Sequence, residues 1–316
     1  MEALIDGFEK NRNAAAAVFR FSSALMHCLC GLLATMQNTG IDATAIQELK
    51  RELKRETRLF SPLRGIAMPA LLTQLSMNDH GTQMLDKMLK AYRLLREEGF
   101  LGTDYLPLPT YILARNEVDM ALCRKTREIY LSMRENKKFL TGGDDTGFAA
   151  LLAVYTDTPQ TASELSLRAY SPLLKRFGAR NETWLMSHIL AFDAERIETN
   201  AESLIALFER LKADKVRFRG MESPILAVLT LLNIEERDAG EIARLSMELR
   251  ARKGFSRWTL SNEQRNLCAA ALLALSKIQG KESSRETRKL LYVLITTALV
   301  TLTTATIQAA SAAAAQ

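Results

Sequence analysis

Three four-residue stretches recur along the chain at a nearly constant spacing: Tyr111-Ile112-Leu113-Ala114, Ala150-Leu151-Leu152-Ala153 and His188-Ile189-Leu190-Ala191. Their first residues are 39 and 38 positions apart. A second series, of aromatic residues, steps by 38, 40 and 38 positions through Tyr92, Tyr130, Tyr170 and Phe208. Self-similarity at a fixed period is typical of an array of stacked supersecondary units, so these two series predict a repeat protein.

Each unit contains two helical patterns of different character. The first is short and nearly all apolar, as in residues 148–155, and the second is longer and amphipathic, as in residues 84–97. Gly99 and Gly178 follow the second pattern in their units, where a left-handed helix C-cap is expected. We therefore predict an all-α fold, an α-solenoid of about seven helical-hairpin repeats of 37–40 residues.

The two ends of the array follow the same scheme. At the front, residues 14–36 are predicted as one helix and residues 42–59 as the next, with Asp42 as the N-cap of the second. No linker rich in Gly, Ser or Pro interrupts the chain. We predict one α-helical repeat domain over residues 1–289, followed by an apolar C-terminal helix and Ala-rich tail, residues 290–316, packed on the last repeat.

Composition agrees with a helical, water-soluble chain. Apolar residues make up 47% and charged residues 25% of the 316 positions, which excludes disordered, collagen-like and disulfide-scaffold classes. Only fifteen glycines and seven prolines are present, so residues that break helices are few. The net charge of +6 is compatible with an acidic partner but does not identify one.

Cysteine and histidine usage limits the possible chemistry. The four cysteines are Cys28, Cys30, Cys123 and Cys268, and no C-x-x-C spacing occurs among them. They are expected to be buried apolar residues in a reducing compartment, which favours a cytoplasmic protein. With only three histidines and no nucleotide-binding or hydrolase motif, we predict no metal and no cofactor.

The C-terminal segment allows two interpretations. No charged residue occurs from Leu290 to Gln316, and the stretch from Leu290 to Gln308 is long enough to cross a bilayer. Its six threonines oppose insertion, and the last repeat needs an apolar cover. We predict a buried last helix, with membrane association through the stretch from Leu290 to Gln308 as the alternative.

Interruptions of the repeat are the places where functional residues are expected. Arg64 lies in a Pro- and Gly-containing turn that could hold an anion. Asp144 and Asp145 follow two glycines and could serve as acid and base, or one of them could cap the following helix. His188 occupies a position that holds Tyr or Ala in other units.

A further interruption lies near the end of the array. Trp258 follows an arginine in a loop, a combination that is common at protein interfaces. Arg265 lies in the helix that the loop precedes. Basic residues also recur near the ends of the longer helices, where they could follow a phosphate backbone or complement the helix dipoles.

These interruptions together resemble a known family. The quoted stretches are Leu59-Phe60-Ser61-Pro62-Leu63-Arg64-Gly65, Phe139-Leu140-Thr141-Gly142-Gly143-Asp144-Asp145, Ser187-His188-Ile189-Leu190-Ala191, and Phe255-Ser256-Arg257-Trp258-Thr259-Leu260 with Arg265. They are similar to a bacterial family catalogued as domain of unknown function four thousand and three, over residues of about 50 to 280. The resemblance implies a bacterial intracellular protein and carries no activity, cofactor or catalytic residue with it. The paired glycines depart from the hydroxyl residue expected beside the two aspartates, which weakens a role for a hydroxyl there.

The sequence therefore predicts a binding protein rather than an enzyme. A protein-binding scaffold is the first interpretation, because the repeats offer a surface and no catalytic constellation is evident. Two alternatives remain open: a helical-array enzyme with a site near Asp144 and Asp145, and a solenoid that binds phosphate or nucleic acid.

Overall fold

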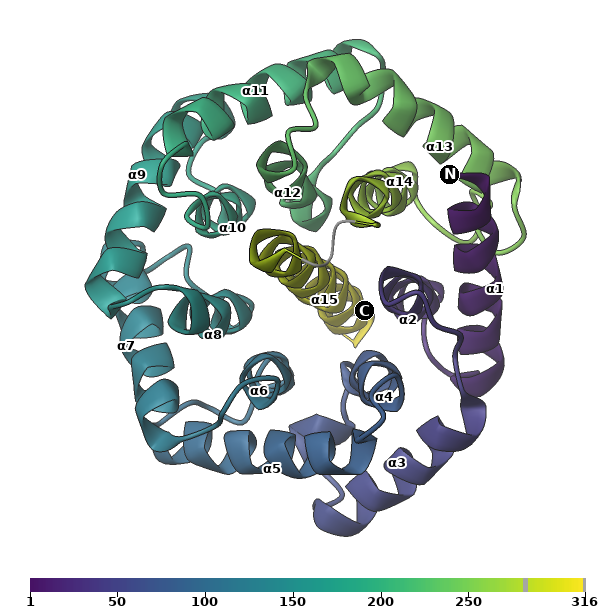
Figure 1. The fold of residues 1–316 in the computed structure, drawn as a ribbon, viewed down its shortest axis with the longest axis vertical. Coiled ribbons are helices and arrows are strands. Elements are labelled where there is room, and N and C mark those ends of the chain that lie inside the picture. Colours follow the sequence, from purple (N-terminus) through teal and green to yellow (C-terminus); the bar gives the residue numbers. More distant parts are fainter. Residues whose placement is uncertain (281–283, 315–316) are drawn as a thin grey trace.

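The structure is a computed structural model that describes residues 1–280 and 284–314. Within this part of the chain it contains fifteen α-helices and no strand. The prediction of an all-α fold is confirmed. Figure 1 shows that the helices form two concentric layers around one central helix.

Two sets of helices alternate along the chain. The outer layer consists of α1 (Glu2–Val18), α3 (Ala43–Glu56), α5 (Gly81–Glu97), α7 (Met120–Asn136), α9 (Pro159–Phe177), α11 (Ile197–Ala213) and α13 (Ala239–Ala251). The inner layer consists of α2 (Ala24–Met36), α4 (Met68–Ser76), α6 (Pro107–Ala114), α8 (Asp145–Tyr155), α10 (Asn181–Leu190), α12 (Ile225–Leu231) and α14 (Asn262–Ile278). The central helix is α15 (Arg285–Ala314).

Hydrophobic patterning explains which helices lie inside. Every residue of α6 is buried, and its sequence is apolar on all sides. In α5 the buried residues are Leu85, Met88, Ala91 and Leu95, which form one stripe at a spacing of three to four residues. An all-apolar helix must be surrounded by protein, whereas a striped helix has one face for solvent, so the short helices fill the inner layer.

The two layers close into a ring, in contrast to an open solenoid with two free ends. Helix α14 contacts both α1 and α2. At the junction the Phe8 and Phe255 rings lie 4.9 Å apart, and Arg252 donates a hydrogen bond of 2.6 Å to Asp6. The first and last pairs therefore cover each other's apolar faces.

The N-terminal pair begins earlier in the chain than the sequence predicted. The expected single helix over residues 14–36 is wrong, because residues 19–23 form a turn between α1 and α2. The Ser23 side chain accepts a hydrogen bond from the backbone N–H of Met26 and thereby starts α2 as its N-cap. The expected N-cap at Asp42 is confirmed, since its carboxylate accepts from Thr44 and Ala45.

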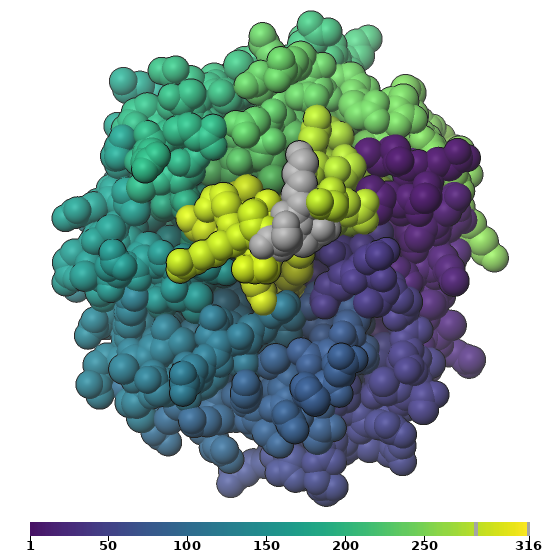
Figure 2. Space-filling view, in the orientation of Figure 1, coloured from purple at the N-terminus to yellow at the C-terminus, as the bar shows by residue number. Residues whose placement is uncertain are grey.

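Helix α15 fills the middle of the ring, where its atoms are visible in Figure 2. It contacts α14, as the sequence suggested, but also α2, α12, α8 and α6. Its residues from Val293 to Thr304 are all buried. The last two residues of the Ala-rich tail, 315–316, lie outside the described residues. The apolar C-terminal segment is therefore the axis of the core and not a cover on one pair.

One helix of the described chain is long and apolar enough to cross a membrane by length and composition, and this helix is α15. In its most apolar window 72% is buried inside the ring. Core helices of soluble proteins pass the same test of length and hydropathy, and the inner layer provides the apolar surroundings that α15 needs.

Successive outer helices run in the same direction around the ring (Figure 1). Ser132 of α7 bonds to Ser163 of α9, and further along, Arg168 of α9 pairs with Glu198 of α11. Near the ends of the same two helices, Arg176 pairs with Glu209. All loops that lead from an outer to an inner helix therefore lie at one end of the ring, and all loops that lead back lie at the other.

The two ends carry opposite charge. The outer-to-inner loops, hereafter the basic end, are residues 19–23, 57–67, 98–106, 137–144, 178–180, 214–224 and 252–261. They hold twelve Lys and Arg residues against five Asp and Glu residues. The inner-to-outer loops, hereafter the acidic end, are residues 37–42, 77–80, 115–119, 156–158, 191–196 and 232–238. Among these described loops three arginines face ten acidic residues, so the fold separates charge along its axis.

Candidate functional site

The structure brings three of the predicted site residues together. Asp144 and Asp145 lie at the start of α8, and His188 lies on the neighbouring inner helix α10. The His188 Nε2 atom is 3.3 Å from the Asp145 Oδ1 atom, and both side chains are fully buried. The Trp184 and Phe148 rings lie 4.4 and 6.3 Å from the His188 ring, so the pair sits in aromatic surroundings.

Hydrogen bonds determine where the protons of this pair lie. The Ser166 hydroxyl donates to the Ala162 carbonyl, so it can only accept from His188 Nδ1, 3.1 Å away. The His188 Nε2 atom then bears a lone pair that faces a carboxyl oxygen of Asp145. Two acceptors at this distance repel unless a proton lies between them. The Asp145 Oδ1 and His188 Nε2 atoms are buried without a hydrogen-bond partner, and a proton on the Asp145 carboxyl relieves this repulsion.

Burial shifts the pKa values in the matching directions. Desolvation raises the pKa of Asp145 to about 7, although the N–H of Gly142 donates to its other oxygen. Desolvation also lowers the pKa of His188 to about 3. A protonated carboxyl beside a neutral imidazole is the arrangement that these shifts favour.

Asp144 lies beside this pair and binds a different partner. Its Oδ2 atom accepts a hydrogen bond of 2.6 Å from the Asn181 side chain at the start of α10. Desolvation and the neighbouring Asp145 raise the pKa of Asp144 to about 6. Neither aspartate side chain caps α8, so the capping role considered from the sequence is wrong. Asp144 instead joins the start of α8 to the start of α10, and Asp145 faces His188 in the last turn of α10.

Gly143 is required in this loop by the close approach of an aromatic ring. A Cβ atom on Gly143 would lie 2.4 Å from a ring carbon of Tyr105. We expect Gly143→Ala to lower the free energy of unfolding by about 1–3 kcal/mol, because the ring or the loop must move. Urea denaturation measures this loss. Gly240→Ala in the open surroundings of α13 is the control, and an equal loss in both variants would contradict the explanation.

The aspartate–histidine cluster is closed to a substrate. Asp145 and His188 are fully buried and Asp144 is 5% exposed. A pocket of about 330 Å³ reaches Gly143 of the preceding loop and Thr146 of α8, but neither aspartate nor His188 lines it. The described residues also contain no group of three His, Cys, Asp or Glu side chains placed to hold a metal ion. The geometry fits a buried polar connection between inner helices.

Arg64 lies away from this cluster, in the loop between α3 and α4. Its guanidinium donates to the backbone carbonyls of Lys54 and Thr57 and, at 2.8 Å, to the Thr57 hydroxyl. The arginine thus satisfies the C-terminal carbonyls of α3, which have no partner within the helix.

The last two predicted positions lie together where α13 is joined to α14. Arg265 is buried and donates to the carbonyls of Phe255 and Leu260, at 3.2 and 2.7 Å. These bonds hold the loop that carries Trp258. The Trp258 side chain is 84% exposed and has the Arg257 guanidinium 4.7 Å from its ring centre. Arg265 therefore positions a loop that presents an aromatic residue to solvent.

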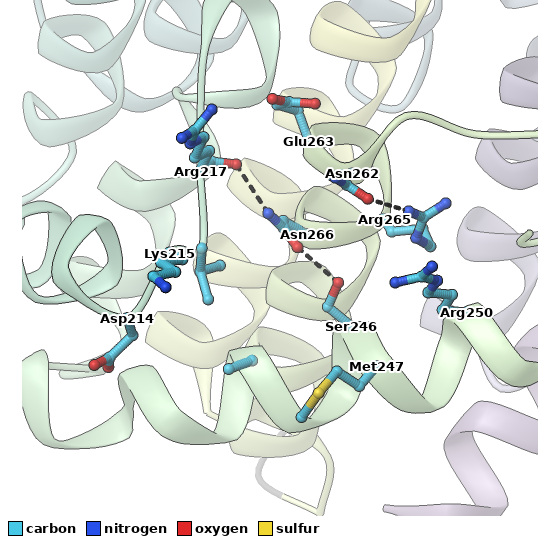
Figure 3. Close-up of a pocket in the computed structure, with 12 residues that line it drawn as sticks. Asp214, Lys215, Arg217, Ser246, Met247, Arg250, Asn262, Glu263, Arg265 and Asn266 are labelled. Carbon is cyan, nitrogen blue, oxygen red and sulfur yellow. Dashed lines mark hydrogen bonds between the residues drawn. The ribbon is translucent and has the colours of Figure 1, made fainter. Parts of the chain in front are cut away.

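Two adjoining pockets at the basic end were not predicted from the sequence. One, of about 440 Å³, is drawn in Figure 3 and lies between segment 214–217, α13 and the start of α14. The other, of about 640 Å³, lies between the same segment and the start of α10. Both are lined by Lys215, Val216 and Arg217, so this segment forms the ridge between them.

Buried and exposed side chains alternate along the ridge. Val216 and Phe218 are buried, whereas Lys215, Arg217 and Arg219 are exposed. Successive side chains of an extended segment point to opposite sides, so Arg217 and Arg219 share the outward side. Lys215, a turn residue with a φ of 62°, comes just before them and is exposed as well. The ridge is fixed from below by a 2.9 Å hydrogen bond from the Asn266 side chain to the Arg217 carbonyl.

The pocket in Figure 3 adds further basic groups. The guanidiniums of Arg250 and Arg265 lie near each other on its far side from Lys215. The burial of Arg265, and then its proximity to Arg250, lower the pKa of Arg265 below its ordinary value. The Asn266 side chain also accepts a 2.6 Å hydrogen bond from Ser246, which orders the pocket floor. Such a pocket can hold the charged oxygens of a carboxylate or phosphate.

The sequence contained one signal for this surface. Basic residues recurred after the longer helices, but a helix dipole explains them equally well. Only the common direction of the outer helices shows that they gather at one end of the ring. A comparison with curated proteins and with solved structures gave no match. The sequence matches, over residues 11–312, the family described as protein of unknown function (DUF4003), and this nearly complete match means that the chain belongs to that family.

Proposed function

We propose that the protein is a non-catalytic binding module whose basic end holds an anionic partner in the two pockets beside ridge 215–219. The observation that carries the proposal is the exposure of Lys215, Arg217 and Arg219 along this ridge. None of the three forms an ion pair with any described residue, although many other arginines of the protein are paired. Unpaired cations on an ordered backbone are suited to an external anion.

The pocket walls support a partner larger than a single ion. Arg180 and Lys212 line the larger pocket together with the apolar side chains of Phe177, Phe208 and Met186. Apolar walls with a few charged groups bind the non-polar parts of a ligand while the cations orient its charged oxygens. An acidic segment of a partner protein fits this description, which agrees with the scaffold interpretation. A phosphorylated ligand presents the same charged oxygens.

The enzyme alternative has weaker support. Its candidate residues Asp144, Asp145 and His188 are buried among aromatic rings, and their hydrogen-bond partners are all side chains or backbone of the same protein. A general acid or base must reach the proton that it transfers. In the pocket of Figure 3 the carboxylates of Asp214 and Glu263 lie apart and form no pair, so binding is the better-supported role.

Charge reversal on the ridge tests the proposal. Titration calorimetry of the full-length protein against polyglutamate and against polyphosphate separates a carboxylate from a phosphate partner. We expect Arg217→Glu with Arg219→Glu to weaken binding by at least about tenfold, because each lost charge-assisted hydrogen bond contributes about 1.5–3 kcal/mol.

The control changes the net charge equally at the acidic end, by Arg196→Glu with Arg237→Glu. Its affinity should stay within about twofold of the wild type, because dissolved salt screens the exposed charges of the acidic end from a ligand bound at the basic end. Absence of binding to both probes, or equal losses in both variants, would overturn the proposal.

A further inference from the structure

Exposed apolar side chains are concentrated at one end of the ring. Among the described residues, seven large apolar side chains are exposed to 67% or more. Six of them lie in loops of the basic end: Phe21, Leu59, Phe60, Leu101, Phe139 and Trp258. The seventh, Met247, lines the basic pocket of Figure 3. The described loops of the acidic end contain none, so this distribution is not a general property of the loops.

These side chains project individually from the surface. Phe139 is 97% exposed and Phe60 is 94% exposed, so each contacts very little of its own protein. They come from five different loops around the ring, after α1, α3, α5, α7 and α13. Because all these loops close the same end, the side chains form a circle of separate contacts and not one continuous patch.

Cations accompany the aromatic residues in the same loops. Arg20 precedes Phe21, Arg58 precedes Leu59, and Lys138 precedes Phe139. Arg257 lies over the Trp258 ring. A surface on which apolar groups alternate with Lys and Arg attracts anionic lipid headgroups and can place its aromatic rings at the lipid interface.

The end of α15 lies at the same end of the ring. Near its start, Lys289 donates to the carbonyl of Phe192 in the acidic-end loop 191–196. Further along, Val300 lies against Gly147 in the first turn of α8, which begins at the basic end. The helix therefore runs toward the basic end, where its exposed last turns, 308–314, carry no charge.

We propose that the basic end docks on a membrane surface that contains anionic lipids. The exposed aromatic residues would enter the interface while the surrounding Lys and Arg residues bind lipid phosphates. This inference rests on the proposed function, because it names the lipid headgroup as the anionic partner of the basic end. It differs from a transmembrane role for α15, which stays in the core of the ring.

Three observations favour a lipid surface over other partners. A second copy of the chain would offer its acidic end to the cations, but that end has no exposed apolar residue among its described loops to meet the aromatic ones. A single nucleic acid strand would have to bend around the whole ring to contact these aromatic residues at once, and one of the five loops offers only the aliphatic Leu101, on which a base cannot stack. A planar interface that accepts separate apolar groups fits both the circle and the charge.

The two tryptophans provide a direct test. Trp258 is exposed, whereas Trp184 is fully buried, so a change in tryptophan emission on docking reports Trp258. The full-length protein is mixed with vesicles of equimolar phosphatidylglycerol and phosphatidylcholine, or of phosphatidylcholine alone. We expect sedimentation with the anionic vesicles only, a blue shift of the emission, and quenching by brominated phosphatidylcholine in the anionic mixture. Trp258→Phe should remove the shift and retain the sedimentation.

Variants separate the apolar contribution from the ionic one. Phe139→Ser with Trp258→Ser should weaken vesicle binding by at least about tenfold, because each ring removes its apolar area from water on docking. Their binding to soluble polyphosphate should not change. Leu131→Ser with Leu174→Ser, on the outer helices, is the matched control and should retain vesicle binding.

The outcomes distinguish this inference from the proposed function. Binding to polyphosphate or polyglutamate without binding to anionic vesicles overturns the inference and leaves the proposed function intact, whereas binding to none of the three overturns both. The inference is also overturned if the protein binds vesicles without a change in the Trp258 emission and the serine variant binds them as tightly as the wild type. Tighter binding to single-stranded DNA than to anionic vesicles would overturn the inference too. The same holds for a mass that rises with protein concentration in sedimentation velocity without lipid.

Discussion

Removal of residues 285–316 is expected to prevent the remaining chain from folding cooperatively. The deletion removes α15 and leaves the inner helices facing an empty channel. Six large aliphatic side chains of α15 are fully or almost fully buried: Val293, Leu294, Ile295, Leu299, Val300 and Leu302. Burial of each stabilises the fold by about 1.5–3 kcal/mol, and their sum is comparable with the whole stability of a typical domain. Thermal unfolding followed by circular dichroism measures the effect.

A point substitution tests the same explanation without shortening the chain. Val300→Asp places a carboxylate against Gly147 in the middle of the ring. We expect it to lower the free energy of unfolding by at least about 3 kcal/mol, because a buried charge without a partner is costly. Ala310→Asp on the exposed end of the same helix is the control and should change stability little. A truncated protein with the full melting temperature would contradict the central position of α15.

Asp145→Asn is expected to make the protein more stable at pH 8 than the wild type, by up to roughly 4 kcal/mol. In the native state burial raises the pKa of Asp145 to about 7 from its ordinary value of 3.8. Between these values the native protein retains a proton that the unfolded chain has released. The contribution of Asp145 to stability is therefore complete below about pH 4 and is lost as the pH rises through 7. The asparagine amide can donate to His188 Nε2 at every pH.

His188 responds in the opposite direction. Its native pKa is lowered to about 3, so stability is lost as the pH falls below 6.5 and the unfolded chain gains a proton. The difference between the wild type and Asp145→Asn isolates the aspartate contribution. Urea unfolding at several values from pH 4 to pH 8 should give a difference that grows with pH. A difference that is constant over this range would contradict an Asp145 carboxyl that stays protonated in the native state.

The sequence predicted the helices better than their arrangement. Continuous apolar runs such as 148–155 become inner helices, and striped patterns such as 84–97 become outer ones, because burial follows directly from the pattern. Ring closure depends on a small rotation between successive pairs, which leaves no trace in the repeat period. The position of α15 depends on that closure, since a channel exists only when the two ends meet.

The candidate site residues, like the helices, were predicted better than their arrangement in space. An interrupted repeat was sufficient to select Asp144, Asp145 and His188, which the structure brings together. Their burial could not be predicted, because it depends on how α8 and α10 pack against each other. The basic residues after the outer helices were evident in the sequence as well, but their gathering at one end follows from the common direction of those helices.

Hydrogen–deuterium exchange tests the central claim, that the basic end is the binding surface, most directly. The exchange of the full-length protein is compared with and without polyphosphate. We predict slower exchange in loops 178–180, 214–224 and 252–261, with no change in the acidic-end loops 115–119 and 232–238. Protection confined to the acidic end or to the outer faces of the helices, or none in loop 214–224, would contradict the account.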